Sequence, residues 1–135
     1  MFSGRRPDNL GVTDGRLTPC RPTPNCVSSQ ADPTDARHYV APLAFAGSAQ
    51  QVMAALRRVI EATPRATVIR QAPNYLYAEF RSRLLGFVDD VEFICDEKSR
   101  AIHVRSASRL GHSDFGVNRA RVEAIRARLG AVSPP

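Results

Sequence analysis

The sequence from Arg105 to Arg121 holds the densest set of groups able to bind an anion. It leads into a predicted helix, whose first backbone N–H groups attract negative charge. Guanidinium and hydroxyl groups donate hydrogen bonds to phosphate, carboxylate or sulfate. The candidate ligand-binding residues of this segment are Arg105, Ser106, Ser108, Arg109, Ser113, Asp114, Asn118 and Arg119. The spacing matches neither a P-loop nor a dinucleotide-binding fingerprint.

Arg105, Arg109 and Arg119 are predicted to converge where the last strand meets the last helix. Arg105 and Arg109 share strand parity, and Arg119 lies in the first turns of the helix. Three guanidinium groups in one place repel one another and require anions. In the structural alternative, carboxylates of the protein itself neutralise the arginines, and the serines only cap the helix. In the functional alternative, an external anion binds to the arginines.

Two neighbouring carboxylates, Asp89 and Asp90, complete the candidate ligand set. Strand alternation places Asp89 on the apolar face, where a carboxylate needs partners such as Arg109 or Arg119. It places Asp90 on the opposite, outward face. In the structural alternative, Asp89 belongs to a buried ion pair, or it lies at the edge of the sheet where its carboxylate reaches water. A small enzyme that uses Asp89 or Asp90 with Arg105 and Arg109 is the catalytic alternative.

The outward face of the predicted sheet is rich in charged and aromatic side chains. Besides Asp90 and Arg105 it carries Tyr75, Tyr77, Glu79, Arg81, Glu92 and His103. One interpretation is a solvated lattice of salt bridges, each contributing about 0–1 kcal/mol. The other is a polar pocket, closed by the N-terminal region, that suits a planar or anionic ligand.

The cysteines allow three interpretations. Cys20 and Cys26 are separated by five residues, within an N-terminal motif that also includes Asn25, Ser28 and Ser29. Reduced structural thiols, a disulfide and a metal or redox site all remain open. No second close pair of ligands supports zinc, so no metal is assigned. No cofactor is indicated either.

The periodicity predicts an α+β fold of order β-α-β-β-β-β-α, with about four to five antiparallel strands and both helices on one face. Ser48 opens the first helix with Gln51 as a capping box, and Pro64 ends it. In the last helix, Phe115, Asn118 and Val122 are expected on the inward side. The strands are expected at 38–45, 66–71, 74–82, 87–95 and 100–108, and the last helix at 114–129.

Length and composition indicate one domain of 135 residues with 43% hydrophobic residues. We expect a proline-rich N-terminal loop region docked on the domain (1–37), an α+β domain (38–130) and a frayed tail (131–135). The net charge is +6, but the 18 arginines are scattered, so there is no strong nucleic-acid signal. No apolar run is long enough to span a membrane, and no signal peptide is visible, so the expected location is cytoplasmic.

Three segments together resemble a widespread bacterial family, the domain of unknown function 1499. They are Pro19–Ser29, Gly86–Phe93 and Arg105–Arg121, and the resemblance extends over roughly Pro7 to Leu129. Arg21 stands where the family leads one to expect proline. The resemblance implies a shared fold but no activity. From the residues we expect a small-ligand or anion-binding module rather than an enzyme, with a small Asp/Arg enzyme or a structural or protein-interaction domain as alternatives.

Overall fold

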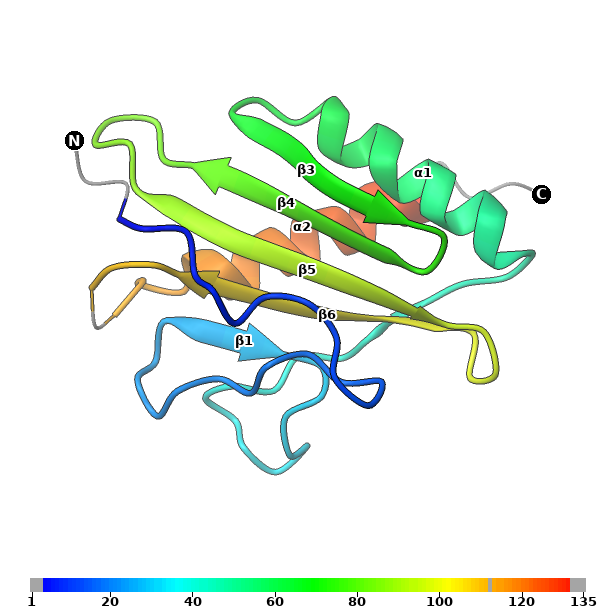
Figure 1. Cartoon of the computed structure of the whole chain (residues 1–135), viewed down its shortest axis with the longest axis horizontal. Helices are drawn as coiled ribbons and strands as arrows, with labels where there is room; N and C mark the ends of the chain where they lie inside the picture. Colours follow the sequence, from blue (N-terminus) through cyan, green and yellow to red (C-terminus); the bar gives the residue numbers. More distant parts are fainter. Residues whose placement is uncertain (1–3, 112, 132–135) are drawn as a thin grey trace.

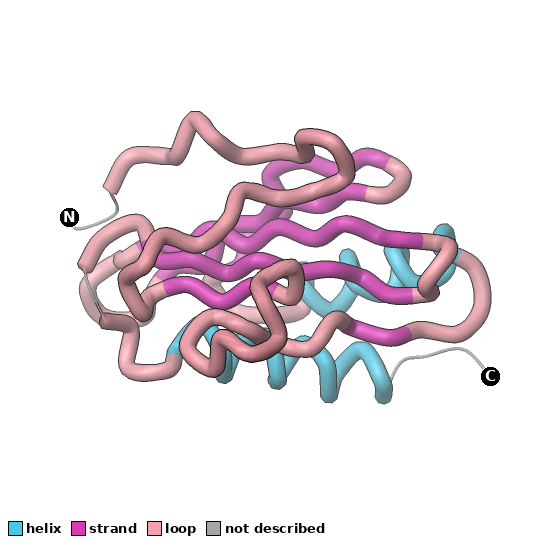
Figure 2. Tube along the Cα trace, turned by 90° about the horizontal axis from the view of Figure 1, so that it is seen from below, coloured by secondary structure: helices cyan, strands magenta, loops and turns pink. Residues whose placement is uncertain are grey.

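The computed structural model describes residues 4–111 and 113–131, which form an antiparallel sheet with two helices on one face (Figures 1 and 2). The sheet has six strands in the order β1-β6-β5-β4-β3, and β2 pairs with β6 beside β1. The predicted fold class and element order are confirmed. The elements are β1 Cys26–Ser28, β2 Leu43–Ala44, α1 Ala49–Glu61, β3 Ala66–Ala72, β4 Tyr75–Arg81, β5 Val88–Asp96, β6 Ala101–Ser108 and α2 Val117–Ala131.

Helix α1 forms where the capping box predicts it. The Ser48 hydroxyl accepts from the Gln51 N–H at 3.0 Å, and the Gln51 side chain accepts from the Ser48 N–H at 3.1 Å. The reciprocal bonds satisfy two N–H groups that have no partner inside the helix. The helix ends before Pro64, which cannot continue it. Its apolar side then packs on the sheet.

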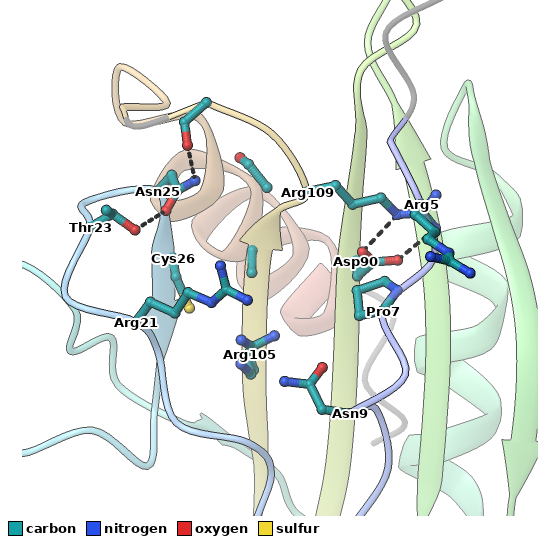
Figure 3. A pocket seen from close by; sticks show the side chains of 13 residues that line it. Arg5, Pro7, Asn9, Arg21, Thr23, Asn25, Cys26, Asp90, Arg105 and Arg109 are labelled. Carbon is teal, nitrogen blue, oxygen red and sulfur yellow. Dashed lines mark hydrogen bonds and ion pairs between the residues drawn. The ribbon is translucent and has the colours of Figure 1, made fainter.

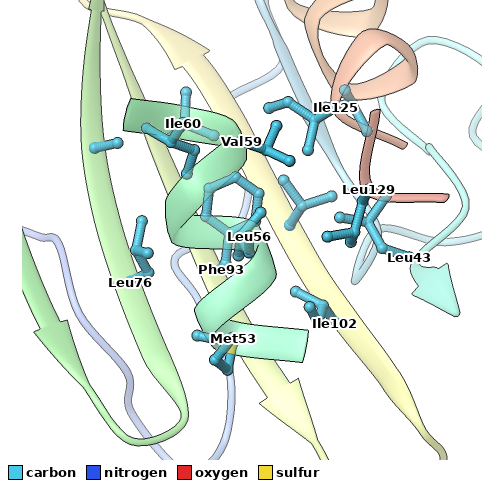
Figure 4. Packing of buried hydrophobic residues seen from close by; sticks show 14 of the residues in the cluster. Leu43, Met53, Leu56, Val59, Ile60, Leu76, Phe93, Ile102, Ile125 and Leu129 are labelled. Atoms are coloured by element: carbon cyan, nitrogen blue, oxygen red, sulfur yellow. The ribbon is translucent and has the colours of Figure 1, made fainter. Parts of the chain in front are cut away.

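The core lies between the two helices and one face of the sheet (Figure 4). Alternate residues of β4, β5 and β6 point into it, because successive side chains of a strand face opposite sides. Leu76, Phe93 and Ile102 are completely buried there, as is Leu56 of α1. The apolar alternation read from the sequence therefore assigns the two faces correctly.

Two local predictions are wrong. The sheet has a sixth strand, β1, inside the region assigned to the N-terminal loop, and it pairs with β6 from Cys26↔Ala107 to Ser28↔Arg105. Three residues are too short a pattern to identify a strand before its partner is known. Phe115 does not join the inward side of α2: it precedes the helix at φ +54° and is 96% exposed.

Asn118, at the start of α2, is a completely buried polar node between the helix and the sheet. Its amide group uses both its donors and its acceptor, at distances of 2.6 to 3.2 Å. The partners are Asn25, Ser106, Ser108, Asp114 and Arg121. One side chain thus joins β1, β6 and both sides of the turn before α2.

We predict that Asn118→Ala lowers the free energy of unfolding by about 3 kcal/mol or more, because several buried groups lose a partner at about 1–3 kcal/mol each. Asn74→Ala is the matched control. The Asn74 amide donates to Glu97 at an exposed turn, so its loss should cost below about 0.5 kcal/mol. Urea unfolding of both variants measures the difference. Equal losses would contradict a structural role for Asn118.

Candidate functional site

The N-terminal segment (residues 4–25) runs along the face of the sheet opposite the helices, as a third layer (Figure 2). Arg6 donates to Glu79 at 2.7 Å, and the Gly11 N–H donates to Glu92 at 2.7 Å. Under this cover Asp90 and Glu92 are only 2% and 1% exposed. The solvated salt-bridge lattice is therefore the wrong interpretation of the outward face.

Arg109 neutralises the carboxylates at one end of this buried face. Its Nε donates to Asp90 at 2.9 Å, and its Nη2 donates to Glu79 at 2.6 Å. The Tyr77 hydroxyl donates to Asp90 at 2.5 Å. The bond to Asp90 raises the pKa of Arg109, while burial and the bond to Asp90 raise the pKa of Tyr77. Arg109 and the two carboxylates therefore neutralise one another inside the protein.

Arg105 lies on the same buried face without such partners. The residue is 8% exposed, and its Nε has no hydrogen-bond partner among the described residues. Burial lowers its pKa, and attraction to Glu92 and Asp90 only partly opposes the effect. Its cross-strand neighbour Glu92 has one oxygen, Oε1, that is equally without a partner there. Arg105 is thus a buried cation with a donor, Nε, that no described residue uses.

A pocket of about 300 Å³ lies where the N-terminal segment, the loop before β1 and the end of β6 meet (Figure 3). Four arginines line it, against one carboxylate, Asp90. Arg21 reaches from the loop toward Arg105 on β6, and Arg5 approaches from the N-terminal segment. The other lining residues are Pro7, Asn9, Thr23, Asn25, Cys26, Ala107, Ser108, Arg109 and Gly111.

The loop that carries Arg21 is closed by a disulfide between Cys20 and Cys26. The reduced-thiol interpretation is therefore wrong, since the local chain path brings the two sulfurs together. The Asn25 amide donates to the Gly111 carbonyl at 2.9 Å and so fastens this loop to the turn after β6. Disulfides persist mainly in oxidising compartments, which weakens the reason for expecting a cytoplasmic protein.

His38 holds the same loop from its other side. Its Nδ1 lies 2.7 Å from an Asp35 carboxylate oxygen, and its Nε2 lies 3.0 Å from the Thr23 carbonyl. Both neighbours are acceptors, and the protonated imidazole, which donates from both ring nitrogens, fits this position. The hydrogen bond to Asp35 accordingly raises the pKa of His38.

The structure divides the predicted ligand set between the two faces of the sheet. Asp90, Arg105 and Arg109 line the pocket, and so does Ser108, whose hydroxyl however accepts from Asn118 on the helix side. Asp89, Ser106 and Asn118 lie on the helix side instead, where strand alternation and the start of α2 place them. Ser113 and Asp114 belong to the turn before α2, and Asp114 accepts from the backbone of Gly116 and Asn118.

Two predicted partnerships of the arginines are wrong. Asp89 pairs with Arg121 at 2.7 Å, and not with Arg109 or Arg119. Arg109 lies on the opposite face of the sheet, and Arg119 donates to the carbonyls of Ala36 and Arg37. The helical turn decides this: at 3.6 residues per turn, positions 119 and 121 point in different directions. The expected cluster of Arg105, Arg109 and Arg119 does not form.

The N-terminal motif is structural in part. Cys26 and Asn25 line the pocket, and Cys20 closes the loop. The Ser28 hydroxyl accepts from the Gln30 N–H at 3.1 Å. The Ser29 hydroxyl accepts from the Val104 N–H at 2.8 Å and lies 2.9 Å from Nδ1 of His103. Both serines therefore fix the chain around β1.

Sequence reasoning missed Arg5, Asn9, Arg21 and Thr23 as pocket residues. Of these four, only Arg21 was marked in the sequence, because it stands where the family leads one to expect proline. The others lie in a loop with no periodicity, so nothing local indicates which surface they face. Only the packing of the N-terminal segment on the sheet brings them to Arg105.

Within residues 4–111 and 113–131, no group of three or more histidine, cysteine, aspartate or glutamate side chains could hold a metal ion. No described helix is long and apolar enough to cross a bilayer. Fold and site together define a small α+β domain with an arginine-lined pocket under its N-terminal segment. The chain belongs to the family described as protein of unknown function (DUF1499), which matches residues 16–129. No curated protein and no solved structure matches the chain.

The Asp35–His38 pair predicts a pH-dependent contribution to stability. A raised His38 pKa stabilises the fold below about pH 6.5, and this is lost as the pH rises through the raised value. The lowered Asp35 pKa stabilises it above about pH 4, and this is lost as the pH falls through the lowered value. Asp35→Asn should therefore destabilise most in weakly acidic solution and progressively less above neutrality.

Urea unfolding across this pH range measures the effect. Asp32→Asn is the matched control, because the Asp32 carboxylate accepts only from Thr34 and has no histidine partner. Its effect should stay constant above about pH 5. A constant effect of Asp35→Asn as well would show that His38 is not protonated in the native state.

Proposed function

We propose that this domain binds a small oxyanion, a phosphate or carboxylate, in the arginine-lined pocket, with Arg105 as the central ligand. The observation that carries the proposal is the buried Arg105 side chain, whose Nε has no hydrogen-bond partner among the described residues. A buried charge without partners is costly, and an anion in the pocket relieves that cost.

The charge of the lining supports an anionic ligand. Arg109 and Asp90 neutralise each other, which leaves Arg5, Arg21 and Arg105 as the uncompensated charges of the pocket. None of these three makes an ion pair with a described residue. Planar guanidinium groups bind phosphate and carboxylate through paired hydrogen bonds. Thr23 and Ser108 also line the pocket, but their hydroxyl groups are already bonded to Asn25 and Asn118.

The same contacts favour binding over catalysis by an Asp/Arg site. The oxygens of Asp90 already accept from Tyr77 and Arg109, and Asp89 pairs with Arg121 on the other side of the sheet. A general base needs a carboxylate whose oxygens are available to the substrate.

Thermal and urea unfolding with inorganic phosphate test the proposal, against sodium chloride at the same ionic strength. An anion bound only to the native state adds RT ln(1 + [L]/Kd), about 2.7 kcal/mol at a hundredfold excess over Kd. We predict that phosphate stabilises the protein and that Arg105→Gln removes this gain. Without phosphate, the variant should differ from the parent by less than about 1 kcal/mol.

Arg58→Gln is the matched control, since Arg58 is exposed on α1, on the helix side of the sheet, and the change removes the same charge. It should keep the full response to phosphate. If Arg105→Gln loses several kcal/mol in chloride alone, Arg105 is the structural counter-ion of Glu92. That result would overturn the proposal, as would a response that both variants retain.

The disulfide gives a second test, because it positions Arg21 at the pocket. Cys20→Ser with Cys26→Ser should cost about 2 kcal/mol of stability through the freed loop. We predict that it also weakens phosphate binding several-fold, and that Arg21→Gln reproduces the weaker binding while the disulfide remains. Titration calorimetry measures both. Unchanged affinity in the two variants would exclude this loop from the site.

A further inference from the structure

Two loops at one end of the sheet carry most of the exposed apolar surface. Residues 82–87 connect β4 to β5, and residues 109–116 connect β6 to α2. The register pairs Arg81 with Val88 and Asp89 with Ser108, so these two end loops leave the sheet at the same end (Figure 1). Six of the seven exposed large apolar side chains of the described residues lie in the end loops or start α2: Leu84, Leu85, Phe87, Leu110, Phe115 and Val117.

Two of these side chains are almost fully exposed, and the turn before α2 holds one of them there. Leu84 is 89% exposed and Phe115 is 96% exposed. Phe115 is held at φ +54° between a serine hydroxyl and the Asp114 carboxylate, which accepts from Gly116 at 2.8 Å. Clustered large apolar side chains on a protein surface mark a site of interaction.

The surface between the 82–87 loop, the turn before β3 and α2 is positively charged. A cleft of about 320 Å³ lies there, lined by five arginines and one carboxylate, Asp89, which Arg121 neutralises. The remaining lining arginines make no ion pair with any described residue: they are Arg65, Arg81, Arg83 and Arg128. Apolar tips thus stand beside uncompensated positive charge.

We propose that this end of the domain docks on an anionic lipid bilayer. The apolar tips of the end loops enter the boundary between headgroups and acyl chains, and the arginines of the cleft contact lipid phosphates. Guanidinium groups suit this role, since they bind phosphate in a paired geometry. The proposal uses none of the arginines that carry the pocket proposal.

The charge pattern favours a bilayer over other occupants. A second copy of the chain, placed tip to tip, would bring two sets of unpaired arginines together. Single-stranded nucleic acid stacks its bases on aromatic platforms. The end loops do expose Phe87 and Phe115, but the side chains at the tip of the 82–87 loop, Leu84 and Leu85, offer no ring for stacking. A bilayer with an anionic surface and an apolar interior offers phosphates to the arginines and an apolar environment to the leucines.

Sedimentation with vesicles tests the proposal on the full chain. We expect binding to equimolar phosphatidylcholine and phosphatidylglycerol, little binding to phosphatidylcholine alone, and weakening by salt. Leu84→Ser and Phe115→Ser should each reduce the partition coefficient by about tenfold or more, as the loss of one inserted side chain implies. Arg83→Gln should reduce it only on the anionic vesicles.

The controls are Val12→Ser, at the exposed apolar side chain outside the end loops, and Arg70→Gln, on exposed β3. Both should bind vesicles like the parent. All the substituted side chains are exposed, so an unchanged melting temperature checks that each variant is folded. Absence of binding to anionic vesicles, or binding that Leu84→Ser and Phe115→Ser leave intact, overturns the proposal. So does a dimer in light scattering that Leu84→Ser dissociates, because a second copy then covers this face.

Discussion

The burial of a charged sheet face is the constraint on which the rest of this structure depends. The outward sides of β4 and β5 present Glu79, Asp90 and Glu92, and the N-terminal segment covers all three. Buried carboxylates are tolerated only with donors close by. Here the donors come from the end of β6, from the strand tyrosines and from the segment itself. The segment is therefore held by the charges that it buries.

Arg105 and Arg109 lie on the same side of the sheet but in two different environments. Both point to the outward face, yet Arg109 reaches Asp90 and Glu79, whereas the Nε of Arg105 has no hydrogen-bond partner among the described residues. The contrast separates a structural arginine from a candidate ligand. It also explains why the pocket stays positive although carboxylates lie beside it. Removing Arg109 would leave buried carboxylates without their donor, whereas Arg105 makes no ion pair with a described residue that its removal would break.

The walls of the pocket come from parts of the chain that are distant in sequence. The disulfide, the Asn25 contact with Gly111 and the His38 ring hold the loop that presents Arg21. Each of these contacts is individually modest, but together they fix a loop that has little apolar surface of its own. The helix side of the sheet carries the core, and the opposite side carries the arginine-lined pocket.

The sequence by itself determined both helices, the four strands from β3 to β6, their order and the two faces of these strands, because hydrophobic period and capping are local properties of the chain. It also placed Asp89 and Asp90 on opposite faces, since strand side chains alternate. Only the tertiary structure decided that Asp89 pairs with Arg121, that Cys26–Ser28 forms a strand, that Cys20 bonds to Cys26, and that Arg5 and Arg21 join Arg105. These outcomes depend on the path of a loop without periodicity and on the direction of helix α2 over the sheet. Both are set by packing between distant segments, which no local pattern records.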